Sequence, residues 1–166
     1  MPGKPAARIA DPVAHPLPLV LTPGPGSKDV LIGFKPAWRG IPAAAAAALQ
    51  SAKASADIAV KTAVAGTTAA AGTPGAPAAY AAEQATKAAA LASLGSMISG
   101  MAAMSDIHMC MTPSPIPPHG PGVVVDGSAT VLVDMMPACR MGDTIVEPLG
   151  PPNKITMGEP TVIIGG

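Results

Sequence analysis

The sequence predicts a mainly β protein with approximate three-fold internal symmetry, into which an α-helical hairpin is inserted. Three observations support this fold class. The motif Pro-Ala-x-Arg-x-x-Asp occurs near both ends of the chain, short aliphatic runs follow Gly-containing turns, and alanine dominates the central block. Short runs of β-branched or aliphatic residues bounded by Gly and Pro are typical of strands, whereas alanine has the highest helix propensity.

The repeated motif has two continuous copies, at residues 5–11 and 137–143. A third copy begins at residues 36–40 and then breaks off. If residues 41–104 are removed, Gly40 joins Ser105, and this copy also becomes complete. Three related units that cannot each bury their own apolar face are expected to close on one another.

The interrupted copy also predicts the domain organisation. We expect residues 1–40 and 105–166 to form one discontinuous β unit, and residues 41–104 to form the insertion. Each predicted strand follows a turn that contains glycine. The three apolar runs expected to form equivalent strands are residues 29–33, 130–133 and 161–165.

The Ala-rich insertion predicts two antiparallel helices, over residues 43–65 and 78–104, separated by a Gly- and Pro-rich segment. Small alanine side chains bury little apolar area, so the hairpin must pack on the β unit or on a partner. The larger residues of the second helix lie on one face. This stripe consists of Leu91, Leu94, Ile98 and Met101. It is predicted to be part of the core. The alternative is that residues 41–104 dock an effector or chaperone through it.

Composition excludes several classes of protein. The formal net charge is zero, charged residues make up 12% and aromatic residues 2%, which argues against a nucleic-acid binder. The chain is 49% hydrophobic, unlike a disordered protein. The first residues lack an apolar signal sequence, so synthesis in the cytoplasm is expected. The longest uncharged helical stretch, residues 88–104, is shorter than a membrane span requires.

Histidine and cysteine residues predict a metal site. The residue four positions after the aspartate of each repeat is His15, Cys110 or Glu147. Three-fold closure of the repeats is expected to bring these three residues towards one axis. His108 shares a strand face with Cys110 because the two are two residues apart. Imidazole and thiolate are ligands that tetrahedral Zn²⁺ takes. The sequence therefore predicts a structural zinc site whose ligands are His15, His108, Cys110 and His119.

Two further residues stay open as alternative ligands. Glu147 occupies a repeat position where a ligand is expected, in place of His108 or His15. Cys139 replaces the second alanine of its motif, and its more ordinary role is a small buried residue. The repeated arginines and aspartates, in turn, are expected to stabilise turns rather than to bind a ligand. The sequence contains no known catalytic motif, so the protein is expected not to be an enzyme.

These motifs resemble the PAAR-repeat family, whose members form the tips of contractile injection machines such as the type VI secretion spike. The similarity extends over residues 2–40 and 105–166. It implies a small conical β fold whose broad base caps a trimeric VgrG-type spike protein, with zinc held near the point by His and Cys. The family's role implies a protein that starts in the cytoplasm, is secreted by the machine, delivers effectors and briefly contacts the target membrane.

The chain departs from the family pattern at three places. Glu147 stands where the family often has cysteine, Trp38 and Cys139 interrupt the Pro-Ala-Ala-Arg motif, and the Ala-rich insertion has no counterpart in the motif. Symmetry matching predicts one copy of this chain for each spike trimer. Two other functions remain open from the sequence: a toxin whose inserted hairpin acts on membranes, and a zinc metalloenzyme with Glu147 near an open metal site.

Overall fold

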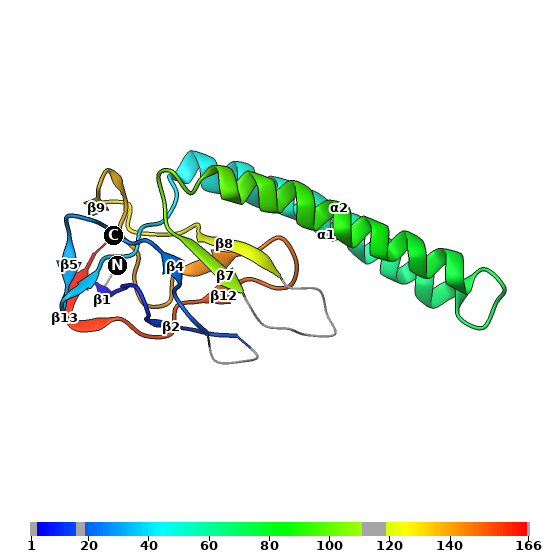
Figure 1. The fold of residues 1–166 in the computed structure, drawn as a ribbon, viewed down its shortest axis with the longest axis horizontal. Coiled ribbons are helices and arrows are strands. Elements are labelled where there is room, and N and C mark those ends of the chain that lie inside the picture. Colours follow the sequence, from blue (N-terminus) through cyan, green and yellow to red (C-terminus); the bar gives the residue numbers. More distant parts are fainter. Residues whose placement is uncertain (1–2, 16–18, 111–118, 166) are drawn as a thin grey trace.

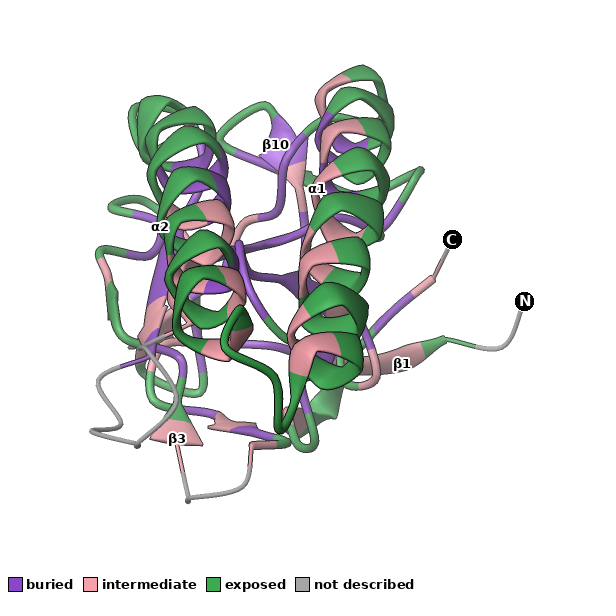
Figure 2. Ribbon diagram, turned by 90° about the vertical axis from the view of Figure 1, so that its right-hand side faces the viewer, coloured by how far each residue is buried: buried purple, intermediate pink, exposed green. Residues whose placement is uncertain are grey.

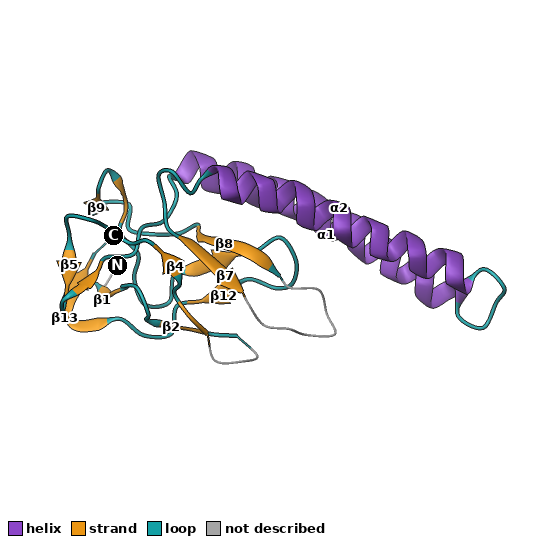
Figure 3. Ribbon diagram, viewed as in Figure 1, coloured by secondary structure: helices purple, strands orange, loops and turns teal. Residues whose placement is uncertain are grey.

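The computed structural model describes residues 3–15, 19–110 and 119–165, and it contains short strands and two long helices (Figures 1 and 3). The helices α1 (Ala43–Ala70) and α2 (Ala76–Gly100) lie between the strands β6 and β7 in the chain. The strands are β1 (Lys4–Ala6), β2 (Pro12–Val13), β3 (Leu19–Val20), β4 (Pro23–Gly24), β5 (Leu31–Ile32), β6 (Lys35–Pro36), β7 (Ile107–Cys110), β8 (Gly120–Val124), β9 (Leu132–Val133), β10 (Met136–Pro137), β11 (Thr144–Val146), β12 (Asn153–Lys154) and β13 (Glu159–Ile164).

In the part of the chain that the structure describes, the strands form one five-stranded sheet and four two-stranded pairs. The larger sheet has the order β12-β11-β8-β7-β4, and all of its neighbouring strands are antiparallel. The pairs are β1-β13, β9-β10, β2-β3 and β5-β6. The predicted fold class, a mainly β unit with an inserted helical hairpin, is confirmed. We call the described residues outside 41–104 the β unit.

A closed ring of main-chain hydrogen bonds links the three repeats. It joins the third residues of the three Pro-Ala-x-Arg motifs. The Trp38 amide donates to the Ala7 carbonyl at 2.9 Å, the Ala7 amide to the Cys139 carbonyl at 2.9 Å, and the Cys139 amide to the Trp38 carbonyl at 3.0 Å. All three residues are fully buried. The repeats therefore satisfy one another's main-chain groups, as units that cannot close alone must do.

Each repeat also holds its arginine by a buried aspartate. Asp11 and Asp143 accept a hydrogen bond from the main-chain amide of the arginine three residues earlier, each at 2.8 Å. Asp106 does the same for Arg39 at 2.7 Å, although 67 positions separate the two residues. The helices thus lie between the arginine and the aspartate of one repeat, and the fold restores in space the contact that the sequence interrupts.

Replacing Asp106 by asparagine should destabilise the chain by about 3 kcal/mol. This carboxylate is fully buried and accepts bonds from the Gly26 amide at 2.7 Å and from the Arg39 guanidinium at 3.0 and 3.1 Å. Removing its charge leaves a partly buried guanidinium without its main partner. Asp134 pairs with the same Arg39 at 3.0 Å but is partly exposed, so Asp134→Asn should cost less than about 1 kcal/mol. Urea unfolding of both variants checks this, and equal losses would contradict it.

Both helices differ from their predicted bounds. The first runs to Ala70 rather than residue 65, because Gly66 faces open space and glycine there costs only about 1 kcal/mol. The second begins at Ala76, since Pro77 falls in the first turn, where its missing N–H has no helical partner to lose. It ends at Gly100, and residues 101–104 form turns.

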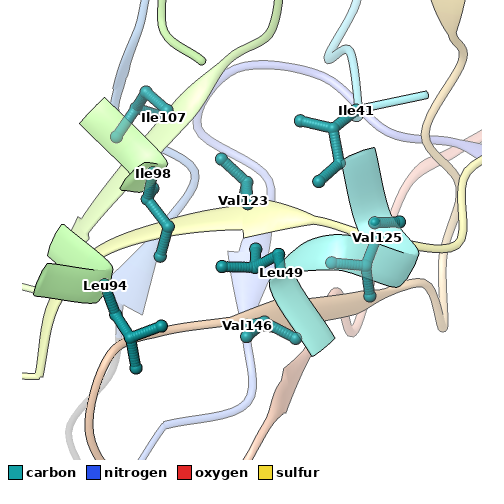
Figure 4. Packing of buried hydrophobic residues seen from close by; sticks show 9 residues of the cluster. Ile41, Leu49, Leu94, Ile98, Ile107, Val123, Val125 and Val146 are labelled. Atoms are coloured by element: carbon teal, nitrogen blue, oxygen red, sulfur yellow. The ribbon is translucent and has the colours of Figure 1, made fainter. Parts of the chain in front are cut away.

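The hairpin packs on the β unit through the half nearest the insertion points. Figure 4 shows Leu49 of α1 and Leu94 and Ile98 of α2 lying over Val123 and other aliphatic residues of the β unit. Leu91, also on the stripe, comes close to β8, as described below. Leu94 and Ile98 of the predicted stripe are therefore core, and Met101 packs partly buried against the same cluster, whereas Leu91 is partly exposed. Docking of an effector or chaperone through residues 41–104 stays a prediction.

The rest of the hairpin projects away from the β unit. In Figure 1 the turn between α1 and α2 lies farther from the two chain ends than any labelled strand does. No residue between positions 58 and 82 is buried, and the outer turns of both helices are exposed in Figure 2. Among the described residues, neither helix has the length and apolar character needed to cross a membrane.

Candidate metal centre and base surface

Four side chains with metal-binding atoms converge in the β unit. His15 follows β2, Cys110 ends β7, His119 precedes β8, and Glu147 follows β11. One ligand atom from each residue lies within 4.8 Å of the others. The ends of three sheet strands and one loop therefore bring together residues that are up to 132 positions apart in the chain. We call these four residues the metal cluster.

The spacing of the donor atoms suits one small cation. His15 Nε2 lies 3.2 Å from Cys110 Sγ and 3.1 Å from His119 Nδ1, and His119 Nδ1 lies 2.9 Å from Glu147 Oε2. Atoms bound to one tetrahedral zinc ion at about 2.0–2.3 Å stand about 3.3–3.8 Å apart. These three contacts, at 2.9–3.2 Å, are slightly shorter than this spacing, and all four donor atoms lie within 4.8 Å of one another.

Hydrogen bonding within the cluster cannot serve all of its atoms. His119 Nδ1 has one position for a proton or a lone pair, yet it faces both His15 Nε2 and Glu147 Oε2. Among the described residues, Glu147 Oε1 and His15 Nδ1 are buried without a hydrogen-bond partner. Two imidazoles, one thiol and one carboxylate that meet in this way fit Zn²⁺, which would share their lone pairs.

His108 lies beside the metal cluster rather than within it. Its Nε2 is 3.8 Å from Glu147 Oε1, its side chain is almost fully buried, and among the described residues neither ring nitrogen has a hydrogen-bond partner of normal geometry. Burial, followed by the charge of the nearby His15, lowers the pKa of His108 to about 4. The ring is therefore neutral at neutral pH, and its Nε2 faces the Glu147 carboxylate.

Burial at the metal cluster favours the neutral form of the His15 ring and disfavours the ionised form of the Glu147 carboxylate. Burial, followed by the neighbouring His119, lowers the pKa of His15, so its ring nitrogens keep lone pairs that can bind a metal. Burial also raises the pKa of Glu147, although contacts with His119 and Asn153 and the charge of Lys53 lower it in part. A buried carboxylate of this kind is stabilised by a cation bound beside it.

The structure shows which of the candidate ligands named from the sequence lie together. It brings together His15, Cys110 and His119 from the predicted set, with Glu147 from the alternatives, and places His108 at the edge. The signal for Glu147 was its repeat position, four residues after Asp143, which matches the positions of His15 and Cys110. Residue type favoured His108, and the position four residues after the aspartate favoured Glu147.

Cys139 lies elsewhere, in the hydrogen-bonded ring of the three repeats. It is fully buried and packs with Trp38, Val124 and Ile145. Burial raises the pKa of the Cys139 thiol well above its usual value, so the sulfur remains protonated. Its surroundings are those of a small apolar core residue.

The end of the β unit near the chain termini carries three equivalent exposed aliphatic residues. Ile32, Val133 and Ile164 pack together in one core cluster, one from each repeat. Side chains alternate along a strand, so the preceding residue of each points outward. These residues are Leu31, Leu132 and Ile163, which are 62%, 53% and 58% exposed. Figure 1 shows β5, β9 and β13 near the N and C labels, at the end opposite the hairpin turn.

Two tight turns at the same end display larger apolar side chains. Gly33 and Phe34 join β5 to β6, and Asp134 and Met135 join β9 to β10, all with positive φ. Phe34 at φ 63° and Met135 at φ 65° occupy a region that costs non-glycine residues about 1–2 kcal/mol. They are nevertheless 98% and 83% exposed. We call these two residues, together with Leu31, Leu132 and Ile163, the base surface.

Comparison with known proteins gives one family. A family model described as PAAR motif matches residues 114–166, less than half of the chain. This segment includes His119 and Glu147 of the metal cluster, together with Leu132, Met135 and Ile163 of the base surface. No curated protein and no solved structure matches the chain.

Proposed function

The chain is a PAAR-repeat protein with an Ala-rich helical hairpin between two of its repeats, and we propose that it caps a trimeric VgrG-type spike. The PAAR motif is associated with the spikes of type VI secretion systems, and proteins of this family are secreted by that machinery. In this proposal the base surface contacts the spike, the metal cluster stabilises the opposite end, and the chain leaves the cell with the spike when the machine fires.

The observation that carries this proposal is the three-fold repetition of exposed aliphatic residues on the base surface. One equivalent residue from each repeat, Leu31, Leu132 or Ile163, stands outside a shared core cluster. A three-fold partner can offer the same pocket to each of them. Docking would also cover the edges of the short strands at this end, which otherwise present unpaired main-chain groups.

Phe34 and Met135 also support docking of the spike on the base surface. Large apolar residues that are held in an unfavourable main-chain conformation and almost fully exposed do not stabilise the chain by itself. Strained and exposed residues of this kind commonly mark a binding surface, where the partner covers them. They would act as anchors at the centre of the interface.

The metal cluster supports a structural zinc site with the ligands His15, Cys110, His119 and Glu147. When bound, zinc would cross-link the loop after β2 to the strands β7, β8 and β11. Four protein ligands leave no open position for a water molecule, which a catalytic zinc site requires. The proposed activity is therefore mechanical, and this argument disfavours the metalloenzyme that the sequence left open.

Binding to a trimeric VgrG-type spike protein tests the proposal directly. Mixing the purified chain in excess with the trimer should give a complex of one copy per trimer, measured by native mass spectrometry or light scattering. Symmetry explains this ratio, because three internal repeats occupy one three-fold surface. A ratio of three copies per trimer, or no complex at all, would contradict the capping function.

A further inference from the structure

The inserted hairpin packs directly on the residues that follow two members of the metal cluster. His119 is followed by Gly120, and Glu147 is followed by Pro148. A methyl group added at Gly120 would come within 2.9 Å of Leu91 Cδ1 on α2 and within 3.2 Å of Pro148 Cγ. Leu91 of the hairpin, Gly120 and Pro148 thus meet at one point, immediately beside the metal cluster.

A second contact lies one turn farther along α2. Gly95 is buried, and a Cβ atom placed there would stand 3.8 Å from Pro121 Cδ and 3.9 Å from Pro148 Cγ. These are ordinary van der Waals distances, so α2 passes close to both prolines at this position. Farther along the same face of α2, Leu94 and Ile98 pack with Val123 and Val146 in one core cluster. The contact is apolar, continuous and built from side chains that are largely removed from water.

Helix α1 packs next to the residue before Glu147, since Leu49 and Val146 belong to one core cluster. Lys53, one turn farther along α1, is also buried, and its ammonium pairs with Asp57 on the same helix. The loop that follows Glu147 also contacts another ligand, since a Cβ atom at Gly150 would lie 3.3 Å from the ring of His119. Both helices and this loop therefore pack close to the segments that carry His119 and Glu147.

We propose that the hairpin braces the metal centre, so that zinc binding and the docking of α2 on the β unit stabilise each other. The brace holds the start of β8 and the end of β11 in register, which keeps His119 and Glu147 at the spacing that one ion requires. Zinc, by cross-linking the same two segments, holds in place the surface on which α2 rests. Such a linkage is reciprocal: each event changes the free energy of the other by the same amount. This inference rests on the proposed zinc site and is independent of spike binding.

The first test removes part of the brace. Leu91→Ala in the full chain should lower zinc affinity about tenfold, measured by competition with a zinc chelator, because outer contacts that orient ligands typically contribute 10- to 100-fold. Ile58→Ala is the matched control, since it removes a similar side chain from the hairpin at a position that is 66% exposed. Its zinc affinity should stay within about twofold of the unchanged chain. Equal affinities for the two variants would overturn the proposal.

The second test needs no substitution. Hydrogen exchange of the unaltered chain should be slower with zinc than without it for α2 amides near Leu94 and Ile98, and unchanged for amides near the turn at residues 71–75. Exchange in α2 that does not respond to zinc would overturn the brace. A chain that binds no zinc would overturn both the brace and the proposed metal site. Failure to bind the spike, with the zinc response intact, would overturn only the capping function.

Discussion

Cys110→Ser should abolish stoichiometric zinc binding and lower the melting temperature of the chain by about 8–16 °C. Serine oxygen is a poor replacement for a thiolate ligand, and the remaining three ligands bind zinc weakly. A ligand present at a thousand times its Kd stabilises the folded state by about 4 kcal/mol. For a chain of this size, each kcal/mol changes the melting temperature by about 2–4 °C.

The second cysteine supplies the matched control for this prediction. Cys139→Ala removes a sulfur from a fully buried position outside the metal cluster, so it should retain one zinc and cost only about 1 kcal/mol. Metal analysis and thermal unfolding, with and without a chelator, distinguish the two variants. The chelator should destabilise the unaltered chain and Cys139→Ala, and it should have no effect on Cys110→Ser. Retention of one zinc by Cys110→Ser would contradict the assigned ligand set.

The double substitution Phe34→Asp with Met135→Asp should weaken binding to a trimeric VgrG-type spike by at least about 100-fold. Both side chains project from the base surface, and docking would bury two new carboxylates without partners. Aspartate tolerates a positive φ better than phenylalanine or methionine does, as Asp134 at φ 50° shows. The variant should therefore fold at least as well as the unaltered chain.

Tyr80→Asp tests whether any exposed apolar residue would give the same result. Tyr80 is 57% exposed but lies on α2, away from the base surface. Spike binding by this variant should match that of the unaltered chain, measured by titration of the labelled chain with the trimer. If the double variant binds as well as Tyr80→Asp, or if Tyr80→Asp also loses binding, the base surface is not the interface.

Repeat spacing predicted most of what is symmetric in this protein. The position of Asp106 relative to Arg39 could be inferred from the other two copies of the motif, because a buried carboxylate that caps an arginine turn needs the same local geometry in each repeat. The same spacing related His15, Cys110 and Glu147, and these three residues do meet. Local propensity also predicted both helices, with the start of α1 correct and the other three ends in error by two to five residues.

Other features could not be predicted from spacing or residue type. His108 and Glu147 were both plausible ligands, and their ranking depends on how far each strand carries its side chain towards the shared axis. Nothing in the local sequence distinguishes exposed Phe34 or Met135 from core residues, since apolar residues normally pack inside. Their exposure follows from two tight turns whose strands keep the neighbouring residues, Ile32 and Val133, in the core.

The sequence by itself determined the three repeats, the place of the insertion between Arg39 and Asp106, and the chemical types of the candidate ligands, because these depend on local conformation and on symmetry. Only the tertiary structure decided that Glu147 joins His15, Cys110 and His119, that Leu94 and Ile98 of the α2 stripe are buried on the β unit, and that one end of the β unit exposes three equivalent aliphatic residues. Those outcomes depend on distances between segments far apart in the chain, which are set by the closure of the three repeats and by the packing of the hairpin on them.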